Sequence, residues 1–240
     1  MRAIVFDVES TGTTRPQICQ LAYIVCGEGE VRARNFFFRV DAMNNYAYKV
    51  HHLSMSMLKQ LSGGERFADH AAEILSEFAG ADVLIGHGVA GDIDYLKREL
   101  RRLNLALPEC RRLCTMQLFT GCWGDAVLAS GKPKPPRLSE VWEHFALGEE
   151  EISAYAAKVF GGGSGAHDAR FDAAATYLSL ERAAASGELD TALARLSRVQ
   201  SEKAERDAKR CENAPPGKSA PRSRAAHAHG RGRRRPQDTK

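Results

Sequence analysis

The sequence predicts an α/β fold with a mixed β-sheet, in which three antiparallel strands are followed by parallel strands and helices cover both faces. Three strand-like runs open the chain at residues 2–8, 20–26 and 31–40, close enough together to form an antiparallel meander. After them, amphipathic helical patterns alternate with short apolar runs. A Rossmann order is not expected, because a helix would then follow every strand.

The opening strand, Arg2–Val8, is apolar and runs into two acidic residues. The next two strands, Gln20–Cys26 and Val31–Val40, are joined by the turn Gly27-Glu28-Gly29-Glu30, whose glycines suit a hairpin. Further along, Phe67–Ala79 has apolar residues at helical spacing. The short apolar run Asp82–Gly86 is typical of a buried strand.

The second half of the chain is predicted to be mainly helical. Ile93–Leu105 places leucines on one face and basic residues on the other, and Lys132–Arg137 is too rich in proline for a helix or strand. The remaining predicted elements are a last strand at Arg112–Thr115, a helix from Met116, helices over Leu138–Leu147 and Ala169–Ala185, and a polar helical extension over Leu189–Cys211.

Length and composition predict one globular domain with appendages. The chain has 240 residues, of which 43% are hydrophobic and 27% charged. No apolar run reaches the roughly 18 residues of a membrane span, and the strand beginning at Ala3 leaves no room for a signal peptide. Six cysteines without a leader favour a reducing, intracellular and cytoplasmic location. We expect a domain over 1–189, a helical extension over 190–213 and a tail over 214–240.

The predicted tail carries much of the positive charge. Residues 214–240 hold eight Lys or Arg and one Asp, a net charge of +7, which leaves −3 for residues 1–213. The tail contains no Ile, Leu, Val, Met or aromatic residue, so it is expected to be disordered. It could contact phosphate backbones or act as a nuclear address, or it could be a solubilising end.

Acidic residues at three separate places predict a single site. Asp7 and Glu9 alternate along a strand, so both carboxylates project from one face and repel each other unless a cation lies between them. Asp92 follows the buried strand at 82–86 and could alternatively be a simple helix N-cap. His167 and Asp172 follow the glycine-rich segment 161–165, which is either a linker or a mobile loop.

Together these positions supply four carboxylates and one histidine. Oxygen ligands select hard cations, so two Mg²⁺ ions, with Mn²⁺ as a substitute, are expected on Asp7, Glu9, Asp92 and Asp172. Two such ions stabilise an in-line phosphoryl displacement. Histidine side chains exchange protons near neutral pH, so His167 suits the deprotonation of an attacking water.

Two further groups of residues allow an alternative interpretation. Cys110, Cys114, Cys122 and His144 could suggest zinc, but their spacing matches no compact zinc motif. Trp123, Trp142 and Phe36–Phe38 are expected to pack in the core or at its edge instead of stacking on bases.

Three motifs resemble those of the DEDDh family of 3′–5′ exonucleases, which are DnaQ-like and have an RNase H-like fold. The first is Phe6-Asp7-Val8-Glu9-Ser10-Thr11-Gly12, and the third is His167-Asp168-Ala169-Arg170-Phe171-Asp172. The second, His87-Gly88-Val89-Ala90-Gly91-Asp92-Ile93-Asp94-Tyr95-Leu96, keeps the metal-binding acid but has Gly88 and Gly91 where the family has Asn and Phe. The resemblance extends from about Ala3 to Leu189.

The resemblance implies removal of nucleotides from a 3′ end, of DNA in preference to RNA, in repair or in proofreading beside a DNA polymerase. It places Asp7, Glu9, Asp92, Asp172 and His167 in catalysis, and Ser10, Thr11 and His51 near the terminal nucleotide. Two alternatives stay open: an exoribonuclease, and a catalytically weak module that binds nucleic acid or a polymerase. No membrane partner is expected, and a homodimer is left open.

Overall fold

A computed structural model describes residues 1–212, apart from residues 13, 28, 125 and 164. The tail predicted over 214–240 therefore lies outside the described residues. The chain divides into two compact units, residues 1–199 and residues 200–240. The first unit contains the whole sheet, and the described part of the second continues a helix. In the part of the chain that the structure describes, no helix is long and apolar enough to span a bilayer.

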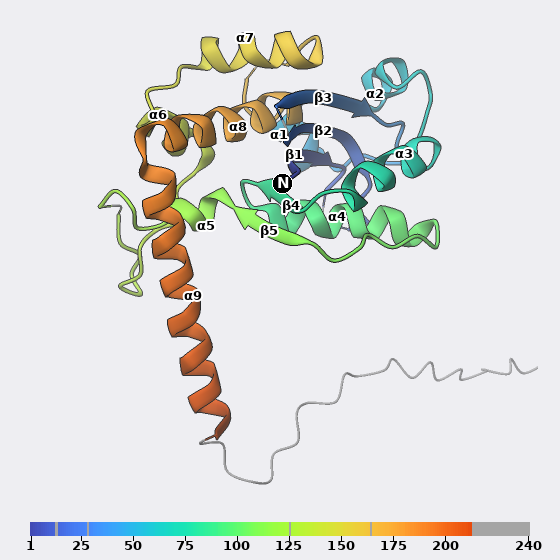
Figure 1. The fold of residues 1–240 in the computed structure, drawn as a ribbon. Coiled ribbons are helices and arrows are strands. Elements are labelled where there is room, and N and C mark those ends of the chain that lie inside the picture. The colour runs from blue at the N-terminus through green and yellow to red at the C-terminus, as the bar shows by residue number, and fades with distance from the viewer. Residues whose placement is uncertain (13, 28, 125, 164, 213–240) are drawn as a thin grey trace, which may run out of the picture. The chain divides into compact units, whose positions relative to one another are not determined.

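Five strands form one mixed sheet in the order β3-β2-β1-β4-β5 (Figure 1). The strands are β1 (Ala3–Ser10), β2 (Ile18–Gly27), β3 (Glu30–Phe37), β4 (Val83–Gly86) and β5 (Arg111–Cys114). β1 pairs antiparallel with β2, and β2 with β3, whereas β4 is parallel to both β1 and β5. The predicted mixed sheet is confirmed, and β1 lies at its centre.

Helices occupy the β3–β4 and β4–β5 connections and follow β5. They are α1 (Asn45–His51), α2 (Met55–Leu61), α3 (Phe67–Ala79), α4 (Val89–Arg102), α5 (Thr115–Phe119), α6 (Leu138–His144), α7 (Glu149–Phe160), α8 (Ala169–Ser186) and α9 (Glu188–Glu212). α3 and α4 cover one face of the sheet, and α8 covers the other (Figure 1).

Alternation along β1 divides the core between the two faces. Ile4, Phe6 and Val8 join the core formed with α3 and α4. Ala3 and Val5 pack on the opposite side, in a core that α8 covers. Since side chains alternate along a strand, Asp7 and Glu9 project to the α8 side. A β-bulge between Glu9 and Ser10 ends the regular pairing of β1 with β2 at this point.

The structure differs from the predicted elements in three added helices and in several element bounds, such as the end of β3 at Phe37 instead of Val40. α1, α2 and α7 were not predicted, and α4 begins at Val89, four residues earlier than expected. Gly88 caps α4 with a φ of 94°, a left-handed conformation that favours glycine. Asp92 therefore lies in the first turn of α4, and the alternative reading of Asp92 as the N-cap was wrong.

Candidate active site

The start of α8 lies close to the sheet because the residues between them are small. Ala22 is the residue of β2 paired with Asp7, and it packs against Ala169 and Ala173 of α8. All three alanines are fully buried. Small side chains allow the helix to approach the strand closely, which brings Asp172, in the first turn of α8, to the side of the sheet on which Asp7 projects.

A polar network fixes the N-terminus of α8 in place. Asp168 is the N-cap, and its carboxylate accepts hydrogen bonds from the Arg170 main-chain N–H (3.0 Å) and from Gln20 Nε2 (2.9 Å). Gln20, which is fully buried on β2, also accepts from the Ala169 N–H at 3.2 Å. Although burial opposes it, the hydrogen bonds from Arg170 and Gln20 lower the pKa of Asp168. This network orients the residues on either side of the cap, His167 and Asp172.

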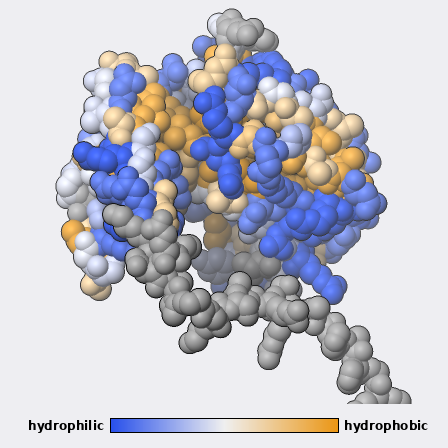
Figure 2. Space-filling view, turned by 60° about the horizontal axis from the view of Figure 1, so that its bottom comes forward, coloured by the Kyte–Doolittle hydropathy of each residue, from blue (hydrophilic) through white to orange (hydrophobic). Residues whose placement is uncertain are grey.

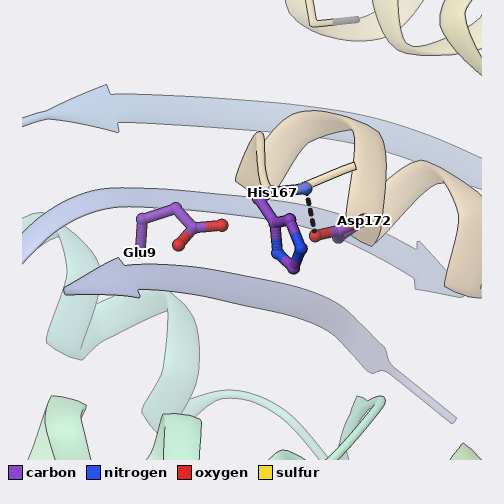
Figure 3. Close-up of side chains that lie close together, drawn as sticks. All are labelled: Glu9, His167 and Asp172. Carbon is purple, nitrogen blue, oxygen red and sulfur yellow. Dashed lines mark hydrogen bonds between the residues drawn. The ribbon is translucent and has the colours of Figure 1, made fainter. Parts of the chain in front are cut away.

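Glu9, His167 and Asp172 form the group that could hold a cation among the described residues. Their ligand atoms all lie within 4.8 Å of one another. Figure 3 shows the imidazole of His167 between the carboxylates of Glu9 and Asp172, with Glu9 on β1 and Asp172 on α8. The His167 main-chain N–H donates to Asp172 Oδ2 at 3.0 Å. His167 has a φ of 67°, and its side chain is exposed.

The acids of this site perturb one another strongly. Burial and the charges of Asp92, Asp172, Glu9 and Asp168 raise the pKa of Asp7 well above its usual value. Burial, followed by the charge of Asp172, raises the pKa of Glu9 to about 9.

The two remaining acids behave in the same way. Burial and the charge of Asp172 raise the pKa of Asp92 to about 7. Burial raises the pKa of Asp172 to about 7, although the hydrogen bond from His167 opposes this shift. The four predicted carboxylates therefore lie close enough to act as one electrostatic unit. Such a cluster favours a divalent cation, which would remove the repulsion.

A cavity of about 650 Å³ opens onto this cluster. Asp7, Glu9, His167 and Asp172 line it, whereas Asp92 does not. The cavity is also lined by residues that the sequence did not place in the site: Met116, Pro135, Pro136, Arg137, Leu138, Ser139 and Trp142. The sequence of Lys132–Arg137 predicted only a loop, and nothing in its residue pattern indicated that it lines a cavity.

His87 also lines the cavity, at the start of the second motif. Its Nδ1 lies 3.0 Å from Thr115 Oγ1, and its Nε2 lies 3.1 Å from the carbonyl oxygen of Pro136. Burial lowers the pKa of His87, which favours a neutral ring. His87 therefore connects the end of β4 to the proline-rich segment. A Cβ atom at Gly88 or Gly91 would meet no atom within 4 Å, although the φ of 94° at Gly88 would strain any other residue there.

Two of the three predicted substrate-binding residues, Ser10 and Thr11, directly follow Glu9, and His51 contacts Ser10 from the end of α1. The Thr11 N–H donates to the Gln17 carbonyl at 2.9 Å, and the Thr11 carbonyl accepts from Asn44 at 3.0 Å. His51 is buried, with 7% of its surface exposed, and its Nε2 lies 3.3 Å from the carbonyl oxygen of Ser10. The Ser10 hydroxyl makes no hydrogen bond within the described residues. Contact with a nucleotide stays a prediction for these residues.

The alternative zinc residues do not come together as a ligand set in the described part of the chain. His144 lies 3.0 Å from Glu188 and stacks on Trp123, with ring centroids 3.9 Å apart. Trp142 packs edge-on against Phe171 in the core, as predicted, and also borders the cavity.

Known proteins share both the sequence pattern and the fold. The model of the exonuclease family (RNase_T) matches residues 4–180. The PolC-type DNA polymerase III of Clostridium perfringens is 28% identical over 106 residues, which are 43% of this chain and 7% of that protein.

Solved structures of exonuclease I have a similar fold. One matches 76% of this chain and 40% of its own, with a TM-score of 0.59 and 17% identity. The Escherichia coli enzyme bound to a dA16 oligonucleotide matches over the same shares, with a TM-score of 0.55 and 18% identity. The Methylocaldum szegediense enzyme also matches 76% of this chain and 40% of its own, with a TM-score of 0.53 and 17% identity. This chain spans about 40% of the length of these structures, whose likeness confirms the RNase H-like fold.

Proposed function

The chain belongs to the exonuclease family whose model it matches, and from this membership we propose that it hydrolyses phosphodiester bonds from the 3′ end of a nucleic acid. The expected products are nucleoside 5′-monophosphates. The observation that carries this proposal is the convergence of Asp7, Glu9, Asp172 and His167 on one cavity, with Asp92 close enough to raise the pKa values of Asp7 and Glu9.

The donor set fits hard divalent cations. Carboxylate oxygens are the ligands that Mg²⁺ and Mn²⁺ prefer. When ionised, the four mutually repelling acids carry an excess of negative charge that two such ions would offset. Asp7, Glu9, Asp92 and Asp172 would hold two Mg²⁺ ions, which Mn²⁺ could replace. The bound ions would supply electrostatic stabilisation to a phosphodiester undergoing in-line displacement.

The chain's own residues would orient the substrate and move the proton. His167 is exposed at the cavity wall and could accept a proton from the attacking water. The main-chain bond from His167 to Asp172 holds that ring beside the acids. Arg137 lines the same cavity and pairs with Glu140 at 3.2 Å, and its guanidinium could also contact a phosphate group. Ser10 could contact the terminal nucleotide.

DNA is the proposed substrate. The structures of exonuclease I include complexes with dA16 and dT13 oligonucleotides, and the relative from C. perfringens is a DNA polymerase. These names support action on DNA 3′ ends, in repair or in proofreading with a polymerase partner. An exoribonuclease with the same chemistry is the second candidate, because the acids and His167 would act on the phosphodiester, which DNA and RNA share. Cytoplasmic localisation stays a prediction.

A gel assay tests this proposal. Full-length protein is incubated with 3′-labelled and 5′-labelled DNA, and with matching RNA, in Mg²⁺ or EDTA. We expect the 3′ label to be released first as a mononucleotide, 5′-labelled DNA to shorten stepwise, and EDTA to stop both reactions. Binding without cleavage in Mg²⁺ and in Mn²⁺ would instead identify a binding module, and faster cleavage of RNA would identify an exoribonuclease.

The acid cluster also predicts how stability depends on pH. Acids whose pKa is raised in the folded state keep protons that the unfolded chain has released, so their contribution to stability is lost as pH rises through about 7 for Asp92 and Asp172 and about 9 for Glu9. We expect the Tm of the metal-free protein to fall by at least about 4 °C between pH 7 and pH 9.

Mg²⁺ provides the control for this measurement. Burial also raises the pKa of Cys26, so the ionisation of this thiol also lowers the Tm as pH rises. Cys26 lies outside the acid cluster, however. The increase in Tm that Mg²⁺ causes should therefore be larger at pH 9 than at pH 7. A scanning-fluorimetry series in which Mg²⁺ raises the Tm equally at both pH values would contradict the assignment.

A further inference from the structure

A second cavity, of about 910 Å³, lies outside the acidic site and is lined by arginines. Its walls come from the β1–β2 connection and from α4, and we call it the arginine groove: Arg15, Pro16, Gln17, Arg98, Arg101 and Arg102. All four arginines are exposed. Figure 2 shows hydrophilic residues gathered on the right of this view, the side toward which α4 runs in Figure 1. The family's catalytic motifs include none of these arginines.

The positive charge of the arginine groove is largely uncompensated. Arg102 pairs with Glu99 at 2.7 Å. The one acid that lines the groove, Asp41, pairs with Arg66 at 2.8 Å, and that bond lowers the pKa of Asp41. Arg15, Arg98 and Arg101 form no ion pair within the described residues. This is a concentration of free positive charge on a body whose net charge is −3 over residues 1–213.

Hydrogen bonds connect the arginine groove to the segment that follows Glu9. Glu99, which is 7% exposed, accepts a hydrogen bond from the Ile18 N–H at 2.9 Å, and Arg102 Nη2 donates to the Pro16 carbonyl at 2.5 Å. These two bonds hold Pro16 and Ile18 to α4. Thr11, two residues after Glu9, is bonded to Gln17 through both its main chain and its hydroxyl, which links this segment to the acidic site. The groove is therefore built around the same loop and the same helix as the site.

The spacing along α4 suits a nucleic-acid strand. Asp92 is in the first turn, and Arg98 and Arg101 follow six and nine residues later. At about 1.5 Å per residue these arginines lie about 9 and 14 Å along the helix from Asp92. With a rise of about 3.4 Å per nucleotide, this spans roughly three to four nucleotides.

We propose that the arginine groove binds the phosphodiester backbone of the substrate strand, about three to four nucleotides upstream of the 3′ end that enters the acidic site. This proposal rests on the proposed function. A polyanion approaching four carboxylates is repelled unless positive charge elsewhere holds it, and guanidinium groups bind phosphate through paired N–H donors. The groove would set affinity and the length of strand that is recognised, without reading sequence.

The test compares a long and a minimal substrate with the full-length protein. Binding of a 5′-fluorescent dT12 strand is measured by anisotropy in EDTA, and hydrolysis of the p-nitrophenyl ester of thymidine 5′-monophosphate is measured in Mg²⁺. We expect the double variant R98A/R101A to bind dT12 about tenfold more weakly at low salt. The slope of log K against log salt concentration should become less negative by about 1.4, because two phosphate contacts are lost. Hydrolysis of the ester should be unchanged, because the ester is too short to reach the groove.

Two further variants complete the design. R98K/R101K, which keeps the charges, should retain most of the affinity. R182A removes an exposed arginine of α8 that pairs with Glu151 of α7, and it should bind dT12 as the wild type does. Wild-type affinity and salt slope for R98A/R101A would overturn the proposal, and so would a parallel loss of ester hydrolysis, which would indicate a structural effect. A wild-type protein that binds dT12 through these arginines but hydrolyses neither substrate would overturn the proposed function and leave this inference standing.

Discussion

Replacing Asp172 with asparagine is expected to reduce Mg²⁺-dependent release of 3′ nucleotides by at least about 10³-fold, because it removes a carboxylate from the proposed cation site. The same change should make the metal-free protein more stable. Asp172 contributes to the raised pKa values of Asp7, Glu9 and Asp92, so an uncharged amide relieves repulsion in a crowded cluster. Its Oδ1 can still accept the hydrogen bond from the His167 N–H.

The two effects together separate catalysis from folding. We expect the Tm of metal-free D172N at pH 8 to rise by about 2–4 °C, the shift that about 1 kcal/mol produces in a chain of this size. The matched control is D94N, which removes an exposed acid from α4. It should change neither the rate nor the Tm appreciably. Single-turnover rates and scanning fluorimetry check both points, and a D172N protein with wild-type activity would exclude Asp172 from the mechanism.

Replacing His167 with alanine is expected to lower the turnover rate by about 10²- to 10⁴-fold, the range typical of a lost general base. His167 lies between Glu9 and Asp172 and lines the cavity (Figure 3). Its ligand atoms lie within 4.8 Å of theirs, so it could serve either as a proton acceptor or as a cation ligand. We assign it to proton transfer because the oxygen donors already suit a hard cation.

Thermal shifts distinguish these two roles. If His167 transfers a proton, H167A should show the same Mn²⁺-induced rise in Tm as the wild type, and added imidazole should restore part of the rate. A variant that loses the Mn²⁺ shift together with its activity would make His167 a ligand instead. H144A, which alters an exposed histidine paired with Glu188, controls for general effects of removing an imidazole.

The sheet and the central residues of the site could be predicted from local patterns. Asp7 and Glu9 alternate on one strand, so their common direction follows from strand geometry alone. Asp172 follows a glycine-rich segment and lies one turn into a helix, as its spacing from His167 indicated. The antiparallel start of the sheet and its later parallel strands followed from which connections contained helices, whereas the order of the strands came from the structure.

Other parts of the site depend on packing that no local pattern encodes. The approach of α8 to Asp7 requires alanines in β2 and α8 that are distant in sequence. The cavity wall at Pro135–Arg137 is held by a hydrogen bond between His87 and Pro136, 49 residues away. α1 and α2 are only seven residues long, and so short a segment carries little periodicity.

Side chains from β1 and α8 are proposed to bind divalent cations together. Crystals soaked in Mn²⁺ and measured for anomalous scattering near the manganese edge test this binding most directly. We predict an anomalous peak within coordination distance of carboxylate oxygens from Asp7, Glu9 and Asp172, absent from crystals soaked in EDTA. Fully ordered carboxylates with no peak between them, at a Mn²⁺ concentration that supports hydrolysis in solution, would contradict the account.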